Sequence, residues 1–198
     1  MKDFTELNFR PAETGDALSL AKLIDIAGEG IPNWLWSHSA EAGQSALDVG
    51  VNRARRTTGG FSYTNARVAE RFGDIVGMVL MYPIATMPDA DVDELPQPIV
   101  PFVELEQLSV GTWYVNALAV LPHARGLGIG TALMADAEQA ARCNGYDWLS
   151  IQVYEQNSGA VRLYERLGYS LAARSPVLSH PCAPYYTGDV LMLEKTLA

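Results

Sequence analysis

Three glycines alternate with other residues in one short stretch, at Gly126, Gly128 and Gly130. The preceding residues, 113–121, are almost wholly apolar and predict a buried strand. The following residues, 131–144, are rich in Ala, Leu and Met and predict a helix. Glycine lets a backbone approach a ligand closely, and the N–H groups at a helix start favour negative charge. This junction between strand and helix therefore predicts an anion-binding site.

Four interpretations of the glycine loop compete. A P-loop needs a lysine after its last glycine, and the loop contains none. A dinucleotide fingerprint needs its third glycine at position 131, where Thr131 stands, and it would normally open the first βα unit of a fold. The remaining interpretations are a site for the pyrophosphate of coenzyme A and a glycine-rich turn without a ligand. The residues of the loop alone do not decide between them.

Composition narrows the class of protein. The chain has 198 residues, of which 48% are hydrophobic, and we expect a single domain over 1–198. A net charge of −9 argues against a nucleic-acid partner, and no apolar run approaches the roughly 18 residues of a membrane span. The two cysteines, Cys143 and Cys182, show no metal-ligand spacing, so we expect no metal site and a reducing, cytoplasmic location.

The order of predicted elements indicates an α/β or α+β fold around a mixed sheet. The N-terminal half predicts a strand at 7–10, helices at 13–27 and 39–56, and a hairpin with strands at 62–70 and 74–84. A proline-rich and acidic segment, about 83–105, is expected to be an irregular insertion. From 113 onward the pattern predicts a strand at 113–121, helices at 131–144 and 157–167, and strands at 147–154, 169–173 and 189–197.

Two motifs in the same order resemble those of the GNAT N-acetyltransferases. Arg125 to Gly130 matches the family signature Arg/Gln-x-x-Gly-x-Gly/Ala, and Asn116 to Pro122 is similar to the family's fourth strand. Asn157 to Tyr169 resembles the segment Asn-x-x-Ala-x-x-Leu-Tyr-x-x-x-Gly-Phe/Tyr. The resemblance covers about residues 112–170. It implies the GNAT fold, a central mixed and mostly antiparallel sheet that is splayed between strands 4 and 5, with helices on both faces.

The resemblance also implies acetyl-CoA as co-substrate. In the family, backbone N–H groups of the glycine loop wrap the pyrophosphate, which assigns this role to Arg125, Gly126, Leu127, Gly128, Ile129, Gly130 and Thr131. The strand residues Leu118, Ala119 and Val120 would pair with the amides of the pantetheine arm. Asn157 would either bond the cofactor or cap the helix that it precedes.

Catalytic roles follow from the same resemblance. Tyr164 stands where the family places a tyrosine that protonates the departing thiolate; alternatively it is a core aromatic, because Ala160, Leu163 and Leu167 share its helix face. Relatives often carry a glutamate that acts as base through water, and Glu104 and Glu106 are the candidates. Their alternative is a solvated charged loop.

The expected function is transfer of an acetyl group from acetyl-CoA to a primary amine, by direct attack in a ternary complex. No Lys or Arg occurs between Arg71 and Arg125, and this acidic stretch favours a cationic small amine or peptide amine as acceptor, unless it is an exposed loop that serves solubility. One alternative is a non-catalytic acyl-CoA-binding or regulatory module; a nicotinamide-dependent enzyme is another. Oligomeric state stays open, with a homodimer as one option.

Overall fold

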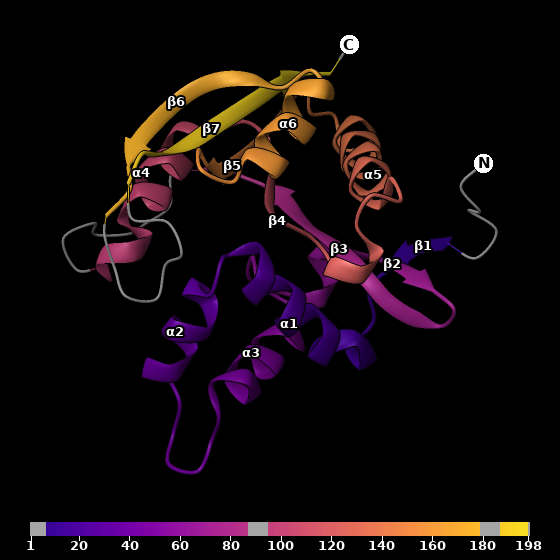
Figure 1. Cartoon of the computed structure of the whole chain (residues 1–198), viewed down its shortest axis with the longest axis vertical. Helices are drawn as coiled ribbons and strands as arrows, with labels where there is room; N and C mark the ends of the chain where they lie inside the picture. The colour runs from indigo at the N-terminus through magenta and orange to yellow at the C-terminus, as the bar shows by residue number, and fades with distance from the viewer. Residues whose placement is uncertain (1–6, 87–94, 179–186, 198) are drawn as a thin grey trace. The chain divides into compact units, whose positions relative to one another are not determined.

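A computed structural model describes residues 7–86, 95–178 and 187–197. Its strands are β1 (Leu7–Pro11), β2 (Ala66–Arg71), β3 (Asp74–Pro83), β4 (Trp113–Val120), β5 (Trp148–Tyr154), β6 (Ser170–Pro176) and β7 (Asp189–Thr196) (Figure 1). Its helices are α1 (Ala17–Ala27), α2 (Ile31–His38), α3 (Ala46–Ala54), α4 (Val100–Leu108), α5 (Ile129–Cys143) and α6 (Ser158–Arg166). No helix in these residues is both long and apolar enough to cross a membrane.

The strands form one 7-stranded sheet in the order β1-β2-β3-β4-β5-β7-β6. The described pairs are antiparallel except β4 with β5, which are parallel. The mixed and mostly antiparallel sheet that the sequence predicted is thereby confirmed. The chain nevertheless forms two compact units, one of residues 1–81 and 116–137, the other of residues 82–115 and 138–198.

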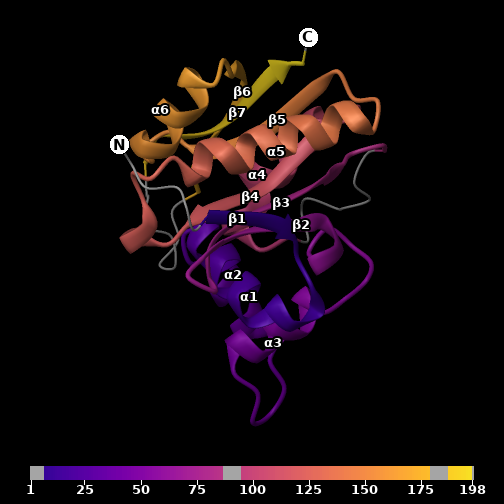
Figure 2. The same ribbon diagram turned by 90° about the vertical axis from the view of Figure 1, so that its right-hand side faces the viewer.

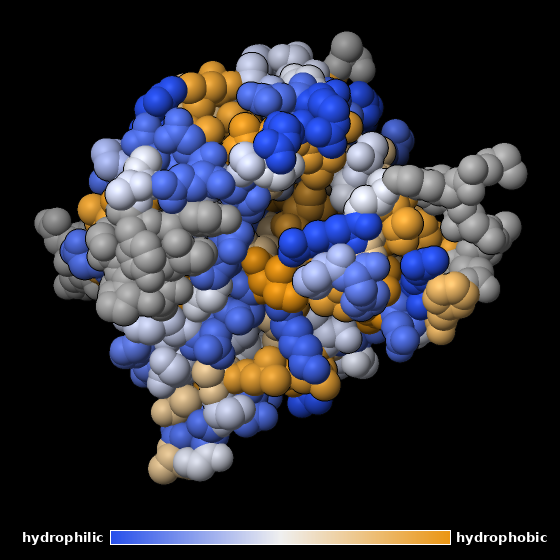
Figure 3. Space-filling model, in the orientation of Figure 1, coloured by the Kyte–Doolittle hydropathy of each residue, from blue (hydrophilic) through white to orange (hydrophobic). Residues whose placement is uncertain are grey.

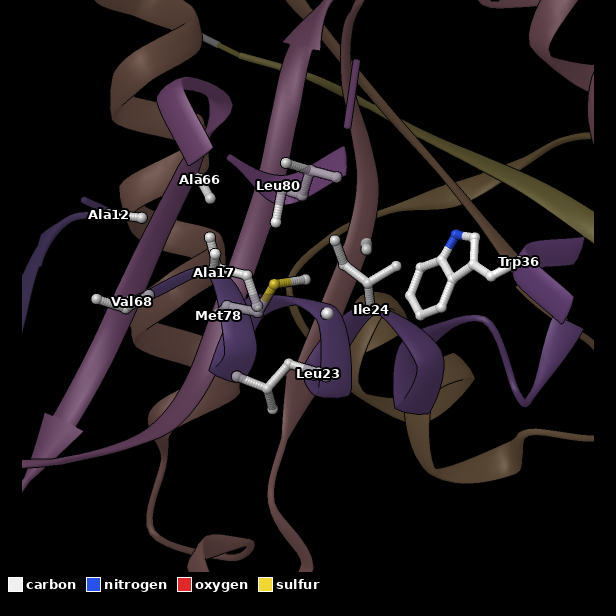
Figure 4. Close-up of a cluster of buried hydrophobic side chains, with 14 of the residues drawn as sticks. Ala12, Ala17, Leu23, Ile24, Trp36, Ala66, Val68, Met78 and Leu80 are labelled. Carbon is white, nitrogen blue, oxygen red and sulfur yellow. The ribbon is translucent and has the colours of Figure 1, made fainter. Parts of the chain in front are cut away.

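The first unit places helices on both faces of its strands. On one face, apolar residues of α1 and α3 pack with Val68, Met78 and Leu80 in a buried cluster (Figures 2 and 4). On the other face, Ile129 and Leu133 of α5 lie close to Gly77 of β3. The turn that joins β2 to β3 has positive φ at Phe72 (54°) and Gly73 (85°), as a two-residue hairpin loop requires, so the predicted hairpin is confirmed.

The predicted helix over 39–56 is confirmed only for residues 46–54, and a further helix over 31–38 was not predicted. A first helix, α2, begins at Ile31, because Pro32 fits the first turn of a helix, where its missing N–H costs nothing. It ends at His38. The second helix, α3, begins only at Ala46, where Ser45 and Asp48 form a capping box. Proline therefore starts a helix here, in a stretch where the sequence pattern predicted none.

The second unit contains the remaining strands, with α4 packed against β6 and β7 and with α6 next to β5 (Figure 1). The expected irregular segment of 83–105 is partly helical. Residues 87–94, with most of its acidic residues, lie outside the described residues. Residues 97–99 form a 3-10 turn that leads into α4, and Pro101 occupies the first helical turn. Glu104 and Glu106 therefore lie on a helix and not in a charged loop.

The surface is of mixed hydropathy. On the face that Figure 3 shows, hydrophobic patches lie among hydrophilic side chains. Several large apolar side chains are exposed within the described residues, namely Leu18, Phe72, Leu108, Val110, Trp148 and Leu171. Scattered exposure of this kind is common on folded proteins and assigns no partner by itself.

Candidate functional site

The glycine loop lies in the first unit, between β4 and α5. Gly126 and Gly128 have φ of 75° and 84°, the left-handed region that favours glycine. The N–H of Ala132 donates to the Gly128 carbonyl at 3.0 Å, the first i to i−4 hydrogen bond at this end of α5. The N–H groups of Ile129, Gly130 and Thr131 precede that bond and point out of the helix end. The loop therefore has the backbone donors and the helix dipole that an anion requires.

Arg125 joins this loop to the strand before it. Its Nε donates to the Val120 carbonyl at 3.0 Å, across the 3-10 turn of residues 122–124. Arg125, Gly126 and Gly128 are exposed, and Leu127 is half-buried. The guanidinium thus ties the start of the loop to the end of β4, and the loop itself stays accessible to a ligand.

Gly77 on β3 allows the first turn of α5 to lie directly on the strand. A Cβ at this position would lie 3.0 Å from the Ala119 carbonyl oxygen, 3.3 Å from Ile129 and 3.4 Å from Leu133. Ala119 belongs to β4, so a larger residue at 77 would push against both elements that position the loop. The close approach requires glycine for its small size, not for its backbone conformation.

We expect Gly77→Val to destabilise the protein by about 1–3 kcal/mol, because the added methyl groups have no space between β3 and α5. Thermal unfolding measures the change, and the Kd of acetyl-CoA should rise as the first turn of α5 shifts. Gly59→Val is the matched control, since a Cβ at Gly59 meets nothing within 4 Å, although φ is positive there. Equal affinity in the wild type and in Gly77→Val would contradict this account of how the loop is positioned.

Strand β4 places its predicted cofactor residues in the first unit. Ala117 and Ala119 belong to the buried cluster that α1 and α3 form with the strands. Leu118 and Val120 alternate with them along β4 and are half-buried. The register of β4 with β5 runs only from Trp113 to Val115. The splaying of strands 4 and 5 beyond this register stays a prediction.

Asn157 and Tyr164 lie in the second unit, at the beginning and near the end of α6. The Asn157 side chain caps the helix, because its Oδ1 accepts from the Ala160 N–H at 3.3 Å. The Tyr164 side chain is only 4% exposed, and its ring meets that of Tyr169 edge-on at 6.1 Å. Burial raises the pKa of Tyr164, so its phenol keeps its proton around neutral pH. A core aromatic and a proton donor are both compatible with this environment.

The structure separates the two candidate bases by their surroundings. Glu104 is exposed, and its Oε2 accepts from the Ser175 hydroxyl at 2.8 Å. Glu106 is half-buried, and burial raises its pKa above the ordinary value of 4.5. A carboxylate with a raised pKa is the stronger proton acceptor, so Glu106 is the better candidate.

One cluster near Tyr164 was missed by the sequence analysis. It consists of Glu138, Tyr169 and Lys195, which come from α5, the end of α6 and β7. A signal was present, because Glu138 interrupts the apolar face of the predicted helix 131–144 beside Met134, Ala137 and Ala141. Within the described residues, no group of three or more His, Cys, Asp and Glu side chains is arranged to hold a metal ion.

Comparison with known proteins agrees with this fold and loop. The model of the Acetyltransferase (GNAT) family matches residues 30–169. The uncharacterized N-acetyltransferase YhfO of Bacillus subtilis (strain 168) is 26% identical over 163 residues, which cover 82% of this chain and 89% of YhfO.

Solved structures show the same fold. An N-acetyltransferase from Staphylococcus aureus Mu50 is 17% identical with a TM-score of 0.67, over 95% of this chain and 100% of its own. The yncA protein of Salmonella typhimurium, solved with its cofactor acetyl-CoA, is 16% identical with a TM-score of 0.61, over 97% of this chain and 94% of its own.

The chain belongs to the GNAT acetyltransferase family, because the family model covers more than half of it. It is an N-acetyltransferase, as the family and its curated relative indicate. The resemblance inferred from the two sequence motifs is confirmed, and so are the fold class and the class of enzyme.

Proposed function

We propose that the chain transfers the acetyl group of acetyl-CoA to a primary amine by direct attack in a ternary complex. The observation that carries this proposal is the glycine loop, in which two left-handed glycines directly precede the first turn of α5. In this proposal the N–H groups from Arg125 to Thr131 hold the pyrophosphate, and Leu118 to Val120 pair with the pantetheine arm. The acetyl-CoA in the yncA structure supports the choice of ligand.

In the proposed transfer the acceptor nitrogen loses two protons, one to Glu106 and one to Tyr164. The acceptor arrives as an ammonium ion and loses a proton to Glu106, directly or through water. The nitrogen lone pair forms the new C–N bond to the thioester carbon, and a strand N–H near Leu118 stabilises the oxyanion. The C–S bond then breaks, and its electron pair stays on sulfur. Tyr164 gives its proton to that sulfur and recovers one when the new amide nitrogen releases its second proton.

We also propose that residues 1–198 act as one N-acetyltransferase domain. The two compact units contribute strands to one hydrogen-bonded sheet, and the chain passes between them within β3, β4 and α5.

Glu106 makes the pH dependence of the reaction a test of this proposal. Because its pKa is raised, the carboxylate form is lost at a higher pH than for an ordinary glutamate. We expect kcat to fall as the pH decreases, with an apparent pKa above 4.5. Glu106→Gln should lower kcat by about tenfold or more and remove this acidic limb.

Glu104→Gln is the matched comparison, since it removes a carboxylate of the same helix that bonds Ser175. We expect Glu104→Gln to keep the wild-type kcat and the acidic limb of the pH profile of kcat. If Glu104→Gln removes the limb and Glu106→Gln keeps it, the assignment of the base is reversed. If both variants keep it, neither glutamate is the base.

The acceptor class is proposed from charge. Residues 72–124 contain no Lys or Arg and seven acidic residues, which favours a cationic amine over a neutral or anionic one. A panel of small amines and peptides, with thiol detection, ranks acceptors by kcat/KM. Preference for anionic acceptors would contradict this part of the proposal.

A further inference from the structure

A buried carboxylate lies at the centre of the cluster that sequence reasoning missed. Glu138 of α5 is 9% exposed. Its Oε1 accepts from Lys195 Nζ of β7 at 2.7 Å and from the Tyr169 hydroxyl at 3.3 Å. Arg142, one helical turn further along α5, brings Nη2 to 3.9 Å from Oε2. A buried charge with this many partners has a fixed place, because moving it would leave charges without compensation.

Tyr169 connects this carboxylate to Tyr164. Helix α6 is followed by Gly168 at φ 89°, and two hydrogen bonds close the end of the helix. The Tyr169 N–H donates to the Tyr164 carbonyl at 3.0 Å, and the Gly168 N–H donates to the Glu165 carbonyl at 3.0 Å. This is the Schellman motif, in which the residue after the glycine packs on the residue five positions earlier. The edge-on contact of the rings of Tyr164 and Tyr169 is that packing contact.

Tyr169 is therefore held both by its backbone and by its side-chain hydroxyl. Its backbone is bonded to α6, its hydroxyl is bonded to Glu138, and the Lys195 ammonium lies 5.5 Å from the centre of its ring. Burial and the Glu138 carboxylate raise the pKa of Tyr169, so its phenol remains a hydrogen-bond donor to that carboxylate. The orientation of the Tyr169 ring is fixed by groups of three different elements.

We propose that Glu138 is a positioning residue. It fixes the hydroxyl and ring of Tyr169, and the Tyr169 ring in turn holds the Tyr164 phenol in place for proton transfer. This inference rests on the proposed role of Tyr164 as the acid. Proton transfer requires the donor within hydrogen-bond reach of the acceptor, so small rotations of the Tyr164 ring reduce the rate of the chemical step. Binding of acetyl-CoA does not depend on that rotation.

A double-mutant cycle tests the proposal. Tyr169→Phe keeps the edge-on ring contact and the helix end but removes the bond to Glu138. We expect Tyr169→Phe and Glu138→Gln each to lower kcat by about fivefold to tenfold, with the KM for acetyl-CoA unchanged. In a Tyr164→Phe background, Tyr169→Phe should lower kcat no further, because the positioned group is absent.

Asp136→Asn is the matched control, since Asp136 lies on the same helix and pairs with Arg67. It should leave kcat unchanged, although it weakens an ion pair of the same helix that is half-buried. Additive losses in the double variant, or Tyr169→Phe and Glu138→Gln at the wild-type kcat, would overturn the positioning role. A wild-type kcat in Tyr164→Phe itself would instead overturn the proposed acid, so the two failures are distinguishable.

Discussion

Tyr164→Phe lowers kcat by about 10²-fold or more, with little change in the Kd of acetyl-CoA. The reason is chemical, because the phenylalanine ring keeps the packing of Tyr164 against Tyr169 but has no proton to give to the departing sulfur. General acid catalysis of this kind contributes about 10²–10⁴-fold. Steady-state rates of thiol release give kcat, and equilibrium titration with acetyl-CoA gives the Kd.

Tyr146→Phe is the control for the loss of a phenol. Tyr146 also lies in the second unit, where its ring is 5.5 Å from that of Trp113, and it has no role in the proposed chemistry. It should retain the wild-type kcat. An equal kcat for Tyr164→Phe and the wild type would leave Tyr164 as a core aromatic and nothing more.

Gly128→Val raises the Kd of acetyl-CoA by at least about tenfold. Gly128 has φ of 84°, and a β-branched residue in that left-handed region is strained by about 1–2 kcal/mol. The backbone relieves the strain by leaving this conformation, which turns the N–H groups before α5 away from the pyrophosphate. Acetyl-CoA titration measures the loss, and kcat at saturating substrate should stay within a few-fold of the wild type.

The same strain elsewhere in the chain provides the control. Gly43 also has φ of 84°, and a Cβ there meets nothing within 4 Å. Gly43→Val should lower stability to a similar extent without changing the Kd of acetyl-CoA. If the two variants bind acetyl-CoA alike, the conformation of Gly128 does not matter for binding, and the glycine loop is only a turn.

The elements that could be predicted are those with local causes. Strong hydrophobic periodicity and end signals placed β4, α5, β5 and α6 to within about two residues. The glycine loop could be predicted because its conformation depends on the glycines themselves. The β2–β3 turn could be predicted because Phe72-Gly73 lies between two periodic runs. These are cases in which the residue type restricts the backbone directly.

The features that could not be predicted depend on contacts between residues that are distant in sequence. Pro32 and Pro101 each start a helix, a choice that local pattern alone did not distinguish from a break. The difference between Glu104 and Glu106 comes from their contrasting burial, together with the bond from Ser175 of β6, 71 residues away. Glu138 and Lys195 meet over 57 residues, and no spacing rule brings them together.

Direct acetyl transfer to an amine in a ternary complex is tested most directly by a matrix of initial rates. Acetyl-CoA and an accepted cationic amine are varied together, with release of free CoA followed by thiol detection and the N-acetyl product by mass. We expect one N-acetylated amine for each CoA released, and double-reciprocal lines that intersect. Parallel lines, or tight binding of acetyl-CoA without any amine-dependent release of CoA, would contradict the account.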